Sequence, residues 1–235
     1  MKVFLMMGQS NMAGRGAIGE VPEIRNEKCF MFRDGNWVLM QEPISTDATY
    51  AGISLAASFA ECYSNHFHEE IGLVPCAVGG TKLERHMPGA DLYENTIKNA
   101  RLALQTGTLS GILWHQGESD SFYFEDAKDY GERFVTMIKT LKKDLGVYDI
   151  PVITGELCEN FLKEYISSEK GRMEYVGFIN EALKKTCDKI PKCAFVSTYD
   201  LADRGDKLHF NSKSLRILGK RYFDAYLNLY NIEKE

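Results

Sequence analysis

The hydrophobic residues of this chain follow two alternating patterns. Five short segments are apolar at almost every position, as is typical of strands that are buried on both faces of a parallel sheet. They span residues 2–7, 71–78, 110–115, 150–154 and 193–198. Longer segments, with apolar residues at every third or fourth position, separate most of these strands and predict amphipathic helices.

The helical spacing is clearest in three segments and weaker over residues 91–106 and 173–185. The apolar positions of the three segments are Leu55, Phe59 and Tyr63; Phe134, Ile138, Leu141 and Leu145; and Leu215, Leu218, Tyr222, Ala225 and Leu229. Residues 28–40, "KCFMFRDGNWVLM", differ from these segments. There Asp34-Gly35 separates two apolar arms, which predicts a small hairpin outside the strand and helix repeat.

Strands that alternate with helices predict an α/β fold, here a three-layer α/β/α sandwich around a mostly parallel sheet. Neither an internal repeat nor a Pro/Gly-rich linker interrupts the pattern, so the sequence predicts one domain over residues 1–235. The longest irregular segments are residues 8–27 and 199–210. Both are candidates for the functional site, because long loops in a compact domain are more often functional than accidental.

Composition and charge narrow the possible partners. The 235 residues are 44% hydrophobic and 26% charged, which is enough apolar material for a real core. The net charge of −5 offers no sequence-wide basic surface to nucleic acid or to an anionic membrane. The first apolar run is shorter than the core of a signal peptide, and no other run has the length of a membrane span. We therefore expect a cytoplasmic protein without a nucleic-acid or membrane partner.

The positions of cysteine and histidine predict no metal site. The six cysteines are irregularly spaced without a C-x-x-C pair, which favours buried, reduced thiols over a zinc or disulfide framework. The segment "HFHEE", residues 66–70, holds four potential ligands. It closes a predicted helix, however, where side chains two positions apart point away from each other. A solvated helix end is the better interpretation.

Polar residues follow four of the predicted strands at their carboxyl ends, where open α/β sheets bind ligands. These segments are Gly8-Gln9-Ser10-Asn11, Gly79-Gly80-Thr81, Gln116-Gly117-Glu118-Ser119-Asp120 and, some residues after the last strand, Asp206-Lys207-Leu208-His209. A hydroxyl, a diglycine, an amide, carboxylates and an imidazole are thus expected at one edge of the sheet. That set of groups is typical of a serine hydrolase.

Each group has a role in that chemistry. Ser10 is a poor nucleophile until an imidazole takes its proton, and His209 needs a carboxylate such as Asp206 to orient its ring. The oxyanion of the tetrahedral intermediate needs hydrogen-bond donors that are fixed in advance. The expected donors are the Ser10 backbone N–H, an N–H from Gly79 or Gly80, and the Gln116 side-chain amide.

Taken one at a time, these residues have simpler explanations. A serine after a strand is more often a helix N-cap, and a diglycine is more often a turn. The main rival motif is G-x-G-x-x-G over Gly14–Gly19, with Asp34 about twenty residues further on, as in dinucleotide-binding loops. That motif requires a strand that ends at its first glycine and a helix after it, whereas the predicted strand ends at Gly8 and Pro22 would interrupt the helix. The agreement of four segments favours the hydrolase.

These segments resemble the four sequence blocks of the SGNH hydrolase superfamily. They read "GQSNMAG" (8–14), "PCAVGGT" (75–81), "GILWHQGESD" (111–120) and "DKLHF" (206–210). More specifically, they resemble the sialate O-acetylesterase and acetylxylan esterase branch, carbohydrate esterase family 6. The resemblance covers nearly the whole chain.

The resemblance implies a fold, a site and an activity. The fold is a flavodoxin-like, five-stranded parallel sheet with strand order 2-1-3-4-5. Ser10 would be the nucleophile, His209 the general base and Asp206 its partner, with Glu118 as the alternative acid; Gln116 stands where the wider superfamily has asparagine. The implied activity is hydrolysis of acetyl esters on xylo-oligosaccharides or sialic acids through a serine acyl-enzyme, without a metal or an organic cofactor.

A second function, a binding module that holds a carbohydrate without cleaving it, stays open at this point. Trp114, Phe122, Tyr123 and Phe124 lie in or near the third block, and aromatic rings of this kind stack on sugar faces. Core packing explains Trp114 equally well. Both functions have an acetylated carbohydrate as the expected partner.

Overall fold

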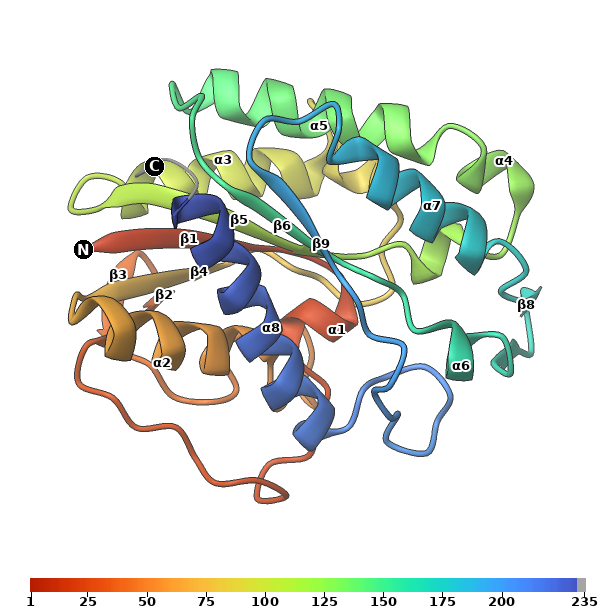
Figure 1. Ribbon diagram of the computed structural model, residues 1–235, viewed down its shortest axis with the longest axis horizontal. Coiled ribbons are helices and arrows are strands. Elements are labelled where there is room, and N and C mark those ends of the chain that lie inside the picture. Colours follow the sequence, from red (N-terminus) through yellow and green to blue (C-terminus); the bar gives the residue numbers. More distant parts are fainter. Residues whose placement is uncertain (232–235) are drawn as a thin grey trace.

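The central sheet has seven strands in the order β3-β2-β4-β1-β5-β6-β9 in the computed structural model, which describes residues 1–231 (Figure 1). Five of them are the predicted strands, which run parallel to one another. Their bounds are β1 (Lys2–Gly8), β4 (Ile71–Pro75), β5 (Thr108–His115), β6 (Val152–Gly155) and β9 (Cys193–Val196). The remaining two are β2 (Cys29–Arg33) and β3 (Asn36–Leu39).

The expected sheet of five strands was too small. The hairpin at Asp34-Gly35 exists, but it belongs to the sheet, because β2 pairs parallel to β4 and β3 pairs antiparallel to β2. Joining the sheet satisfies the backbone groups along the outer edge of β4, and the rings of Phe32 and Trp37 lie 5.0 Å apart between the two arms. Inside the seven-stranded sheet, the five predicted strands occupy the successive positions β4-β1-β5-β6-β9.

Helices cover both faces of the sheet and complete the three predicted layers (Figure 1). One face carries α2 (Leu55–Phe67) and α8 (Ser212–Asn231), and the other carries α3 (Asp91–Ala103), α5 (Tyr130–Asp144) and α7 (Val176–Thr186). All five overlap the segments with helical spacing. The short elements are α1 (Ser10–Ala13), α4 (Phe124–Ala127), α6 (Glu159–Leu162), the 3-10 turns η1 (Leu83–His86) and η2 (Glu118–Asp120), and the hairpin of β7 (Ile166–Ser167) and β8 (Gly171–Arg172).

Phe4, in the middle of β1, joins the sheet to the layer formed by α2 and α8. Its ring meets those of Phe59, Tyr63 and Tyr226 edge-on, with centroids 5.0, 5.2 and 5.3 Å away. Such edge-to-face pairs add to the free energy gained by burying the rings. Since all four side chains are almost fully buried, this cluster fixes how the two helices lie on the sheet.

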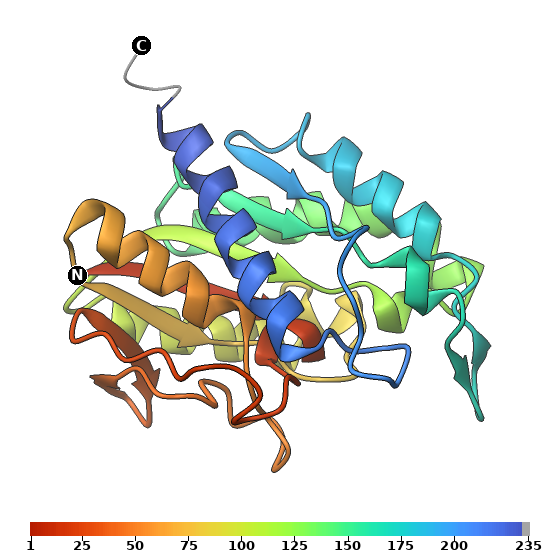
Figure 2. The ribbon, with the colours of Figure 1, turned by 60° about the horizontal axis from the view of Figure 1, so that its bottom comes forward.

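The two helices of this layer approach each other closely at Gly219. Figure 2 shows α8 running beside α2 across the face of the sheet. A Cβ at Gly219 would lie 2.0 Å from the Leu55 carbonyl oxygen and 2.2 Å from Ser58 Oγ, both on α2. Glycine is therefore required here by the distance between two backbones.

We expect Gly219→Ala to destabilise the protein by about 1–3 kcal/mol, because the clash with backbone outweighs the gain of up to about 1 kcal/mol in helix propensity. The matched control is Gly177→Ala on α7, where the nearest atom to the added Cβ is a flexible Glu159 carboxylate oxygen at 3.2 Å. Urea unfolding of both variants measures the difference. A Gly219→Ala protein as stable as Gly177→Ala would contradict the close packing of α2 and α8.

Candidate active site

Ser10 lies where β1 ends and the chain turns into α1. Gly8 has a φ of +128°, and a Cβ at this position would lie 2.1 Å from the His115 carbonyl oxygen at the end of β5. The Gln9 N–H donates to the same carbonyl over 3.0 Å. Only glycine accommodates this turn. As a result, Ser10 is the first residue of α1, only 5% exposed, and lines a cavity at the carboxyl edge of the sheet.

His209 and Asp206 complete a hydrogen-bonded chain with Ser10. His209 Nε2 lies 3.1 Å from Ser10 Oγ, and His209 Nδ1 lies 2.8 Å from Asp206 Oδ2. The other oxygen of Asp206 accepts the backbone N–H groups of Leu208 and His209 over 3.0 and 2.8 Å. With the ring proton on Nδ1, Nε2 is free to accept the proton of the Ser10 hydroxyl. The structure thus brings together the three side chains that the sequence singled out for this chemistry.

The surroundings of this pair favour an ionised aspartate and a neutral histidine. Burial raises the pKa of Asp206, but hydrogen bonds from the His209 ring and backbone and from the Leu208 N–H outweigh it and hold that pKa below its usual value. Burial lowers the pKa of His209, opposed by Asp206 and reinforced by the positive charges of Arg15 and Arg204. These are the protonation states that a general base and its orienting carboxylate need.

Glu118, the alternative acid, contacts a different partner. Its Oε1 accepts a hydrogen bond of 2.6 Å from Asn11 Nδ2. The same amide group donates to the Leu208 carbonyl over 3.2 Å, and Asn11 Oδ1 accepts the Phe210 N–H over 3.1 Å. Asn11 therefore holds the residues on both sides of His209, and Glu118 holds Asn11. The structure places Asp206, and not Glu118, against the imidazole.

Glu118 is a buried carboxyl group whose two oxygens have different surroundings. It is 1% exposed, and among residues 1–231 its Oε2 has no hydrogen-bond partner. Burial raises the pKa of Glu118 to about 7, against the lowering effect of its hydrogen bonds. A group with this pKa changes charge near neutral pH while lining the same cavity as Ser10.

The diglycine faces Ser10, but one of its two N–H groups already has an acceptor. A Cβ at Gly79 would lie 3.4 Å from Ser10 Cβ. The Gly79 N–H donates to Asp47 Oδ2 over 2.8 Å, and the same oxygen lies 2.6 Å from Arg15 Nη2. The ion pair of Arg15 and Asp47 is almost fully buried, with exposed side-chain fractions of 3% and 4%. Gly80 also lines the cavity. Asp47 accepts the N–H of Gly79 and not that of Gly80.

The Gln116 amide is engaged inside the protein. Its Nε2 donates to Gln9 Oε1, the Thr81 carbonyl and Asp120 Oδ2 over 3.1, 2.9 and 2.6 Å, which engages both of its hydrogens. The residue is 0% exposed and is not part of the cavity wall. The expectation that its amide binds the oxyanion is therefore wrong for this structure. The amide instead ties three strand-end segments together.

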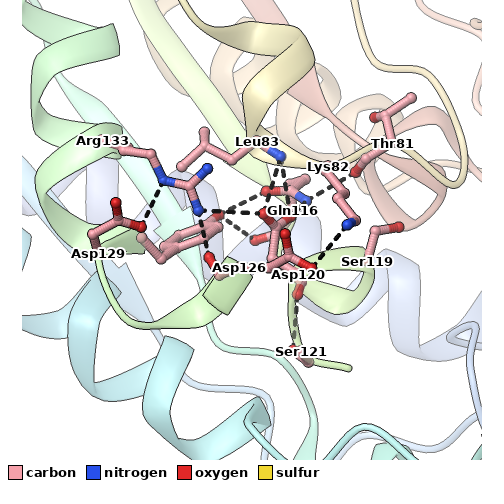
Figure 3. Close-up of polar contacts among 12 residues, drawn as sticks. Thr81, Lys82, Leu83, Gln116, Ser119, Asp120, Ser121, Asp126, Asp129 and Arg133 are labelled. Carbon is pink, nitrogen blue, oxygen red and sulfur yellow. Dashed lines mark hydrogen bonds and ion pairs between the residues drawn. The ribbon is translucent and has the colours of Figure 1, made fainter. Parts of the chain in front are cut away.

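This amide belongs to a larger polar network that braces the segments after β4 and β5 (Figure 3). Asp120 accepts the Leu83 N–H over 3.0 Å and lies 3.8 Å from Arg133 Nη2. Lys82 pairs with Asp126 over 2.8 Å. Burial raises the pKa of Asp120 to about 6, opposed by its hydrogen bonds and by Arg133. The network holds the loop after Gly80 against α5.

The cavity in front of Ser10 has a volume of about 270 Å³. Aromatic side chains form part of its wall, namely Tyr50, Phe122 and Tyr165. Tyr50 lies over the Arg15 guanidinium at 5.2 Å, and Lys170 lies 5.5 Å from the Phe122 ring. Of the rings that the sequence suggested for sugar stacking, Phe122 lines the cavity, whereas Tyr123 and Phe124 lie exposed outside its wall. Trp114 is 0% exposed, so it is a core residue.

Residues 1–231 contain neither a cluster of metal ligands nor a helix that could span a membrane. Within that range, no three His, Cys, Asp or Glu side chains are grouped in a way that could hold a metal ion. In the "HFHEE" segment, His66 lies in the last turn of α2, and the His68 carbonyl accepts a hydrogen bond from Lys28. The helices of the same range are all too short or too polar to cross a bilayer.

Of the residues that shape this site, sequence reasoning misses Asp47. For Asn11 and Arg15 the sequence leaves open whether they brace the turn after Ser10 or touch the substrate, and the structure shows them bracing it. Asn11 follows Ser10 directly and Arg15 lies five residues after it, so their proximity had a signal, although their partners did not. Asp47 lies in the irregular segment before α2 and is 32 residues from Gly79, and no spacing rule connects the two.

The fold places the protein in the α/β class with a mainly parallel sheet, and Ser10, His209 and Asp206 lie at the carboxyl edge, where such sheets bind ligands. More particularly, residues 1–228 match the family described as "Carbohydrate esterase, sialic acid-specific acetylesterase", and the chain belongs to that family. The family expected from the four sequence blocks is thereby confirmed.

Known proteins similar to this chain cover almost all of it. One is the "Probable carbohydrate esterase At4g34215" of Arabidopsis thaliana, 29% identical over 249 residues, which include 97% of this chain and 90% of the relative. The crystal structure of the Arabidopsis thaliana protein AT4G34215 has a TM-score of 0.86 at 27% identity, covering 97% of this chain and 98% of that one.

Two further structures share the fold at lower identity. NanS has a TM-score of 0.75 at 18% identity, and the match covers 97% of this chain and 97% of that one. XAC1771, described as a novel carbohydrate acetylesterase from Xanthomonas citri, has a TM-score of 0.70 at 19% identity over 97% of this chain and 56% of that chain.

The raised pKa of Glu118 predicts a pH-dependent stability. Glu118 binds its proton more tightly in the folded protein than in the unfolded chain, so ionising it lowers the free energy of unfolding. This cost is absent below about pH 4.5, grows as the pH rises and is complete above about pH 7. Glu118→Gln removes this cost and keeps an acceptor for Asn11. We expect the stability of the variant, relative to the native protein, to rise by about 3 kcal/mol between those limits.

Urea unfolding at pH 5 and pH 8 measures this change. The control is Asn95→Gln, an exposed position on α3 whose change removes no ionisable group, so the difference from the native protein should not vary with pH. A flat difference for Glu118→Gln as well would show that Glu118 ionises without a penalty in the folded protein.

Proposed function

We propose that this chain is a carbohydrate O-acetylesterase that hydrolyses acetyl esters on sugars through an acyl-enzyme on Ser10. The observation that carries the proposal is the hydrogen-bonded chain from Ser10 through His209 to Asp206, with distances of 3.1 and 2.8 Å, at the wall of a small cavity. The whole described chain is organised around one seven-stranded sheet, which supports a single esterase domain.

In the first step, Ser10 Oγ attacks the ester carbonyl while His209 Nε2 takes the hydroxyl proton. Asp206 accepts the Nδ1 hydrogen and stabilises the imidazolium that forms. The tetrahedral intermediate then collapses. His209 returns the proton to the sugar oxygen, the bond from that oxygen to the acyl carbon breaks, and the acetyl group remains bound to Ser10 Oγ as an ester.

The oxyanion of that intermediate takes its hydrogen bonds from backbone groups. The first N–H groups of a helix have no partner inside the helix, so Ser10, at the start of α1, supplies one donor. Gly80 supplies the second, because Asp47 engages the N–H of Gly79. Removing one such donor typically costs about 3–4 kcal/mol in the barrier. The buried ion pair of Arg15 and Asp47 holds the diglycine in place behind Ser10.

In the second step, a water molecule attacks the acetyl carbon of the acyl-enzyme. His209 accepts a proton from this water and passes it to Ser10 Oγ, so acetate leaves and the free hydroxyl is restored. The lowered pKa of His209 suits both steps, since the imidazole must be neutral before each attack.

The cavity supports a small acyl group attached to a sugar. Its volume of about 270 Å³ is at the low end of ligand pockets and leaves little room for a long acyl chain. Phe122 and Tyr165 offer aromatic faces beside Ser10, and Tyr50 lies at an exposed position on its wall. The family description names sialic acid, so acetylated sialic acids are proposed substrates beside acetylated xylo-oligosaccharides.

We expect the purified protein to release p-nitrophenol from p-nitrophenyl acetate and to act far more slowly on p-nitrophenyl octanoate, because the cavity is small. Ser10→Ala should lower kcat/KM for the acetate by at least about 10³-fold, since it removes the hydroxyl that lies within hydrogen-bond distance of His209 Nε2. Absorbance at the p-nitrophenol band follows the reaction.

Ser10→Ala also separates this proposal from a carbohydrate-binding module. Serine-dependent acetate release supports the esterase. Equal, low rates for the native protein and the variant, together with unchanged affinity for acetylated sugars, would favour a module that binds without cleaving.

The identity of the acid is tested by comparing Asp206→Asn with Glu118→Gln. We expect Asp206→Asn to lower kcat by about 10⁴-fold, because the amide cannot stabilise the imidazolium or hold the ring in its working tautomer. Glu118→Gln keeps the hydrogen bond to Asn11 and should lose much less. The assignment of Asp206 is wrong if only the Glu118 variant loses several orders of magnitude in kcat.

A further inference from the structure

Two cysteines lie in contact at the edge of the molecule opposite the site. Cys187 follows the last turn of α7, and Cys193 is the first residue of β9. Their Sγ atoms are 2.7 Å apart, within hydrogen-bond distance, and either thiol can be the donor. The site lies at the carboxyl ends of the parallel strands, whereas Cys193 lies at the amino end of its strand. This contact therefore belongs to a feature separate from Ser10 and its cavity.

The backbone around the pair holds the two sulfurs at this distance. Cys193 pairs with Val152 in the sheet, and the Lys192 carbonyl accepts the Val152 N–H over 2.9 Å. Cys187 is held by the end of α7, where its N–H donates to the Lys184 carbonyl. Closing a disulfide shortens the distance between the sulfurs from 2.7 to about 2.0 Å, a shift that side-chain rotation supplies.

The six cysteines differ in how easily an oxidant reaches them. Cys29, Cys76 and Cys158 are buried, whereas Cys62, Cys187 and Cys193 are half-buried. Cys62 lies on α2, on the opposite face of the sheet from α7. The one pair with adjacent sulfurs in the described part of the chain is thus also within reach of small molecules.

We propose that Cys187 and Cys193 form a redox-active dithiol that small disulfides such as oxidised glutathione convert into an intramolecular disulfide. The inference is independent of the proposed esterase function. It also revises the expectation that all six cysteines are simply buried, reduced thiols, because two of them are half-buried and in contact.

The contact between the sulfurs makes each thiol the partner of the other. The hydrogen bond with Cys187 and burial raise the pKa of Cys193, and the buried Lys142 ammonium partly opposes this shift. Either thiol can make the first attack, and its neighbour then resolves the mixed disulfide.

The reaction balances as two exchanges. One of the two cysteines loses its proton to solvent, and its thiolate attacks one sulfur of oxidised glutathione, forming a mixed disulfide and releasing one glutathione thiolate. The second cysteine then loses its proton to solvent and attacks the sulfur of the first, which forms the protein disulfide and releases the second glutathione thiolate. Two protein thiols are oxidised, and one molecule of the small disulfide is reduced to two thiols.

The test is to incubate the intact protein with oxidised glutathione, block free thiols and map tryptic peptides without reduction. Trypsin cuts after Lys185, Lys189, Lys192 and Arg204, so the disulfide joins "TCDK" (186–189) to "CAFVSTYDLADR" (193–204). We expect this crosslinked peptide as the main oxidised product, in the native protein and in the control Cys62→Ser alike.

Single variants test the resolving step. Cys193→Ser should trap glutathione on Cys187, and Cys187→Ser should trap it on Cys193, each at a yield at least about tenfold above the mixed disulfide of the native protein. The proposal of a dithiol is overturned if both native peptides carry only blocked thiols, or if the crosslink runs through Cys62. Single variants with no more mixed disulfide than the native protein would overturn resolution by the neighbouring thiol.

Discussion

The site depends on the close approach of two backbones, Gly8 at the end of β1 and His115 at the end of β5. A Cβ at Gly8 would clash with the His115 carbonyl oxygen. Only glycine therefore lets the first strand end here and turn at once into α1. The turn puts Ser10 at the start of that helix with its N–H free of helical partners. It also puts Asn11 where its amide meets the backbone on both sides of His209.

Most polar side chains around Ser10 hold other parts of the protein in place. Asn11 joins the first strand end to the loop of His209, Gln116 joins the third strand end to the diglycine loop, and Asp47 joins the diglycine to Arg15. Because each is buried and fully engaged, these links leave the loops little freedom. Such preorganisation lets backbone N–H groups act as oxyanion donors without rearranging during the reaction.

The carboxyls at this edge of the sheet differ in charge because their surroundings differ. Asp206 receives hydrogen bonds from two backbone N–H groups and an imidazole, which outweigh its partial burial and keep it ionised. Glu118 is fully buried, one of its oxygens has no hydrogen-bond partner among residues 1–231, and burial raises its pKa to about 7. An imidazolium is stabilised by an ionised neighbour. This difference suits Asp206 better than Glu118 to the proposed role of orienting His209, although Glu118 lines the same cavity as Ser10.

The sequence alone determined the order of strands and helices, because buried strands and amphipathic helices leave periodic apolar patterns. It also singled out Ser10, His209 and the two candidate acids Asp206 and Glu118, which follow strand ends or share a short loop. Only the tertiary structure decided that the hairpin at Asp34-Gly35 joins the sheet and that the Gln116 amide faces the interior. It alone revealed the contacts of Asp47 with Gly79 and of Cys187 with Cys193. Those outcomes depend on side-chain direction and on partners brought together by packing, and residue spacing along the chain encodes neither.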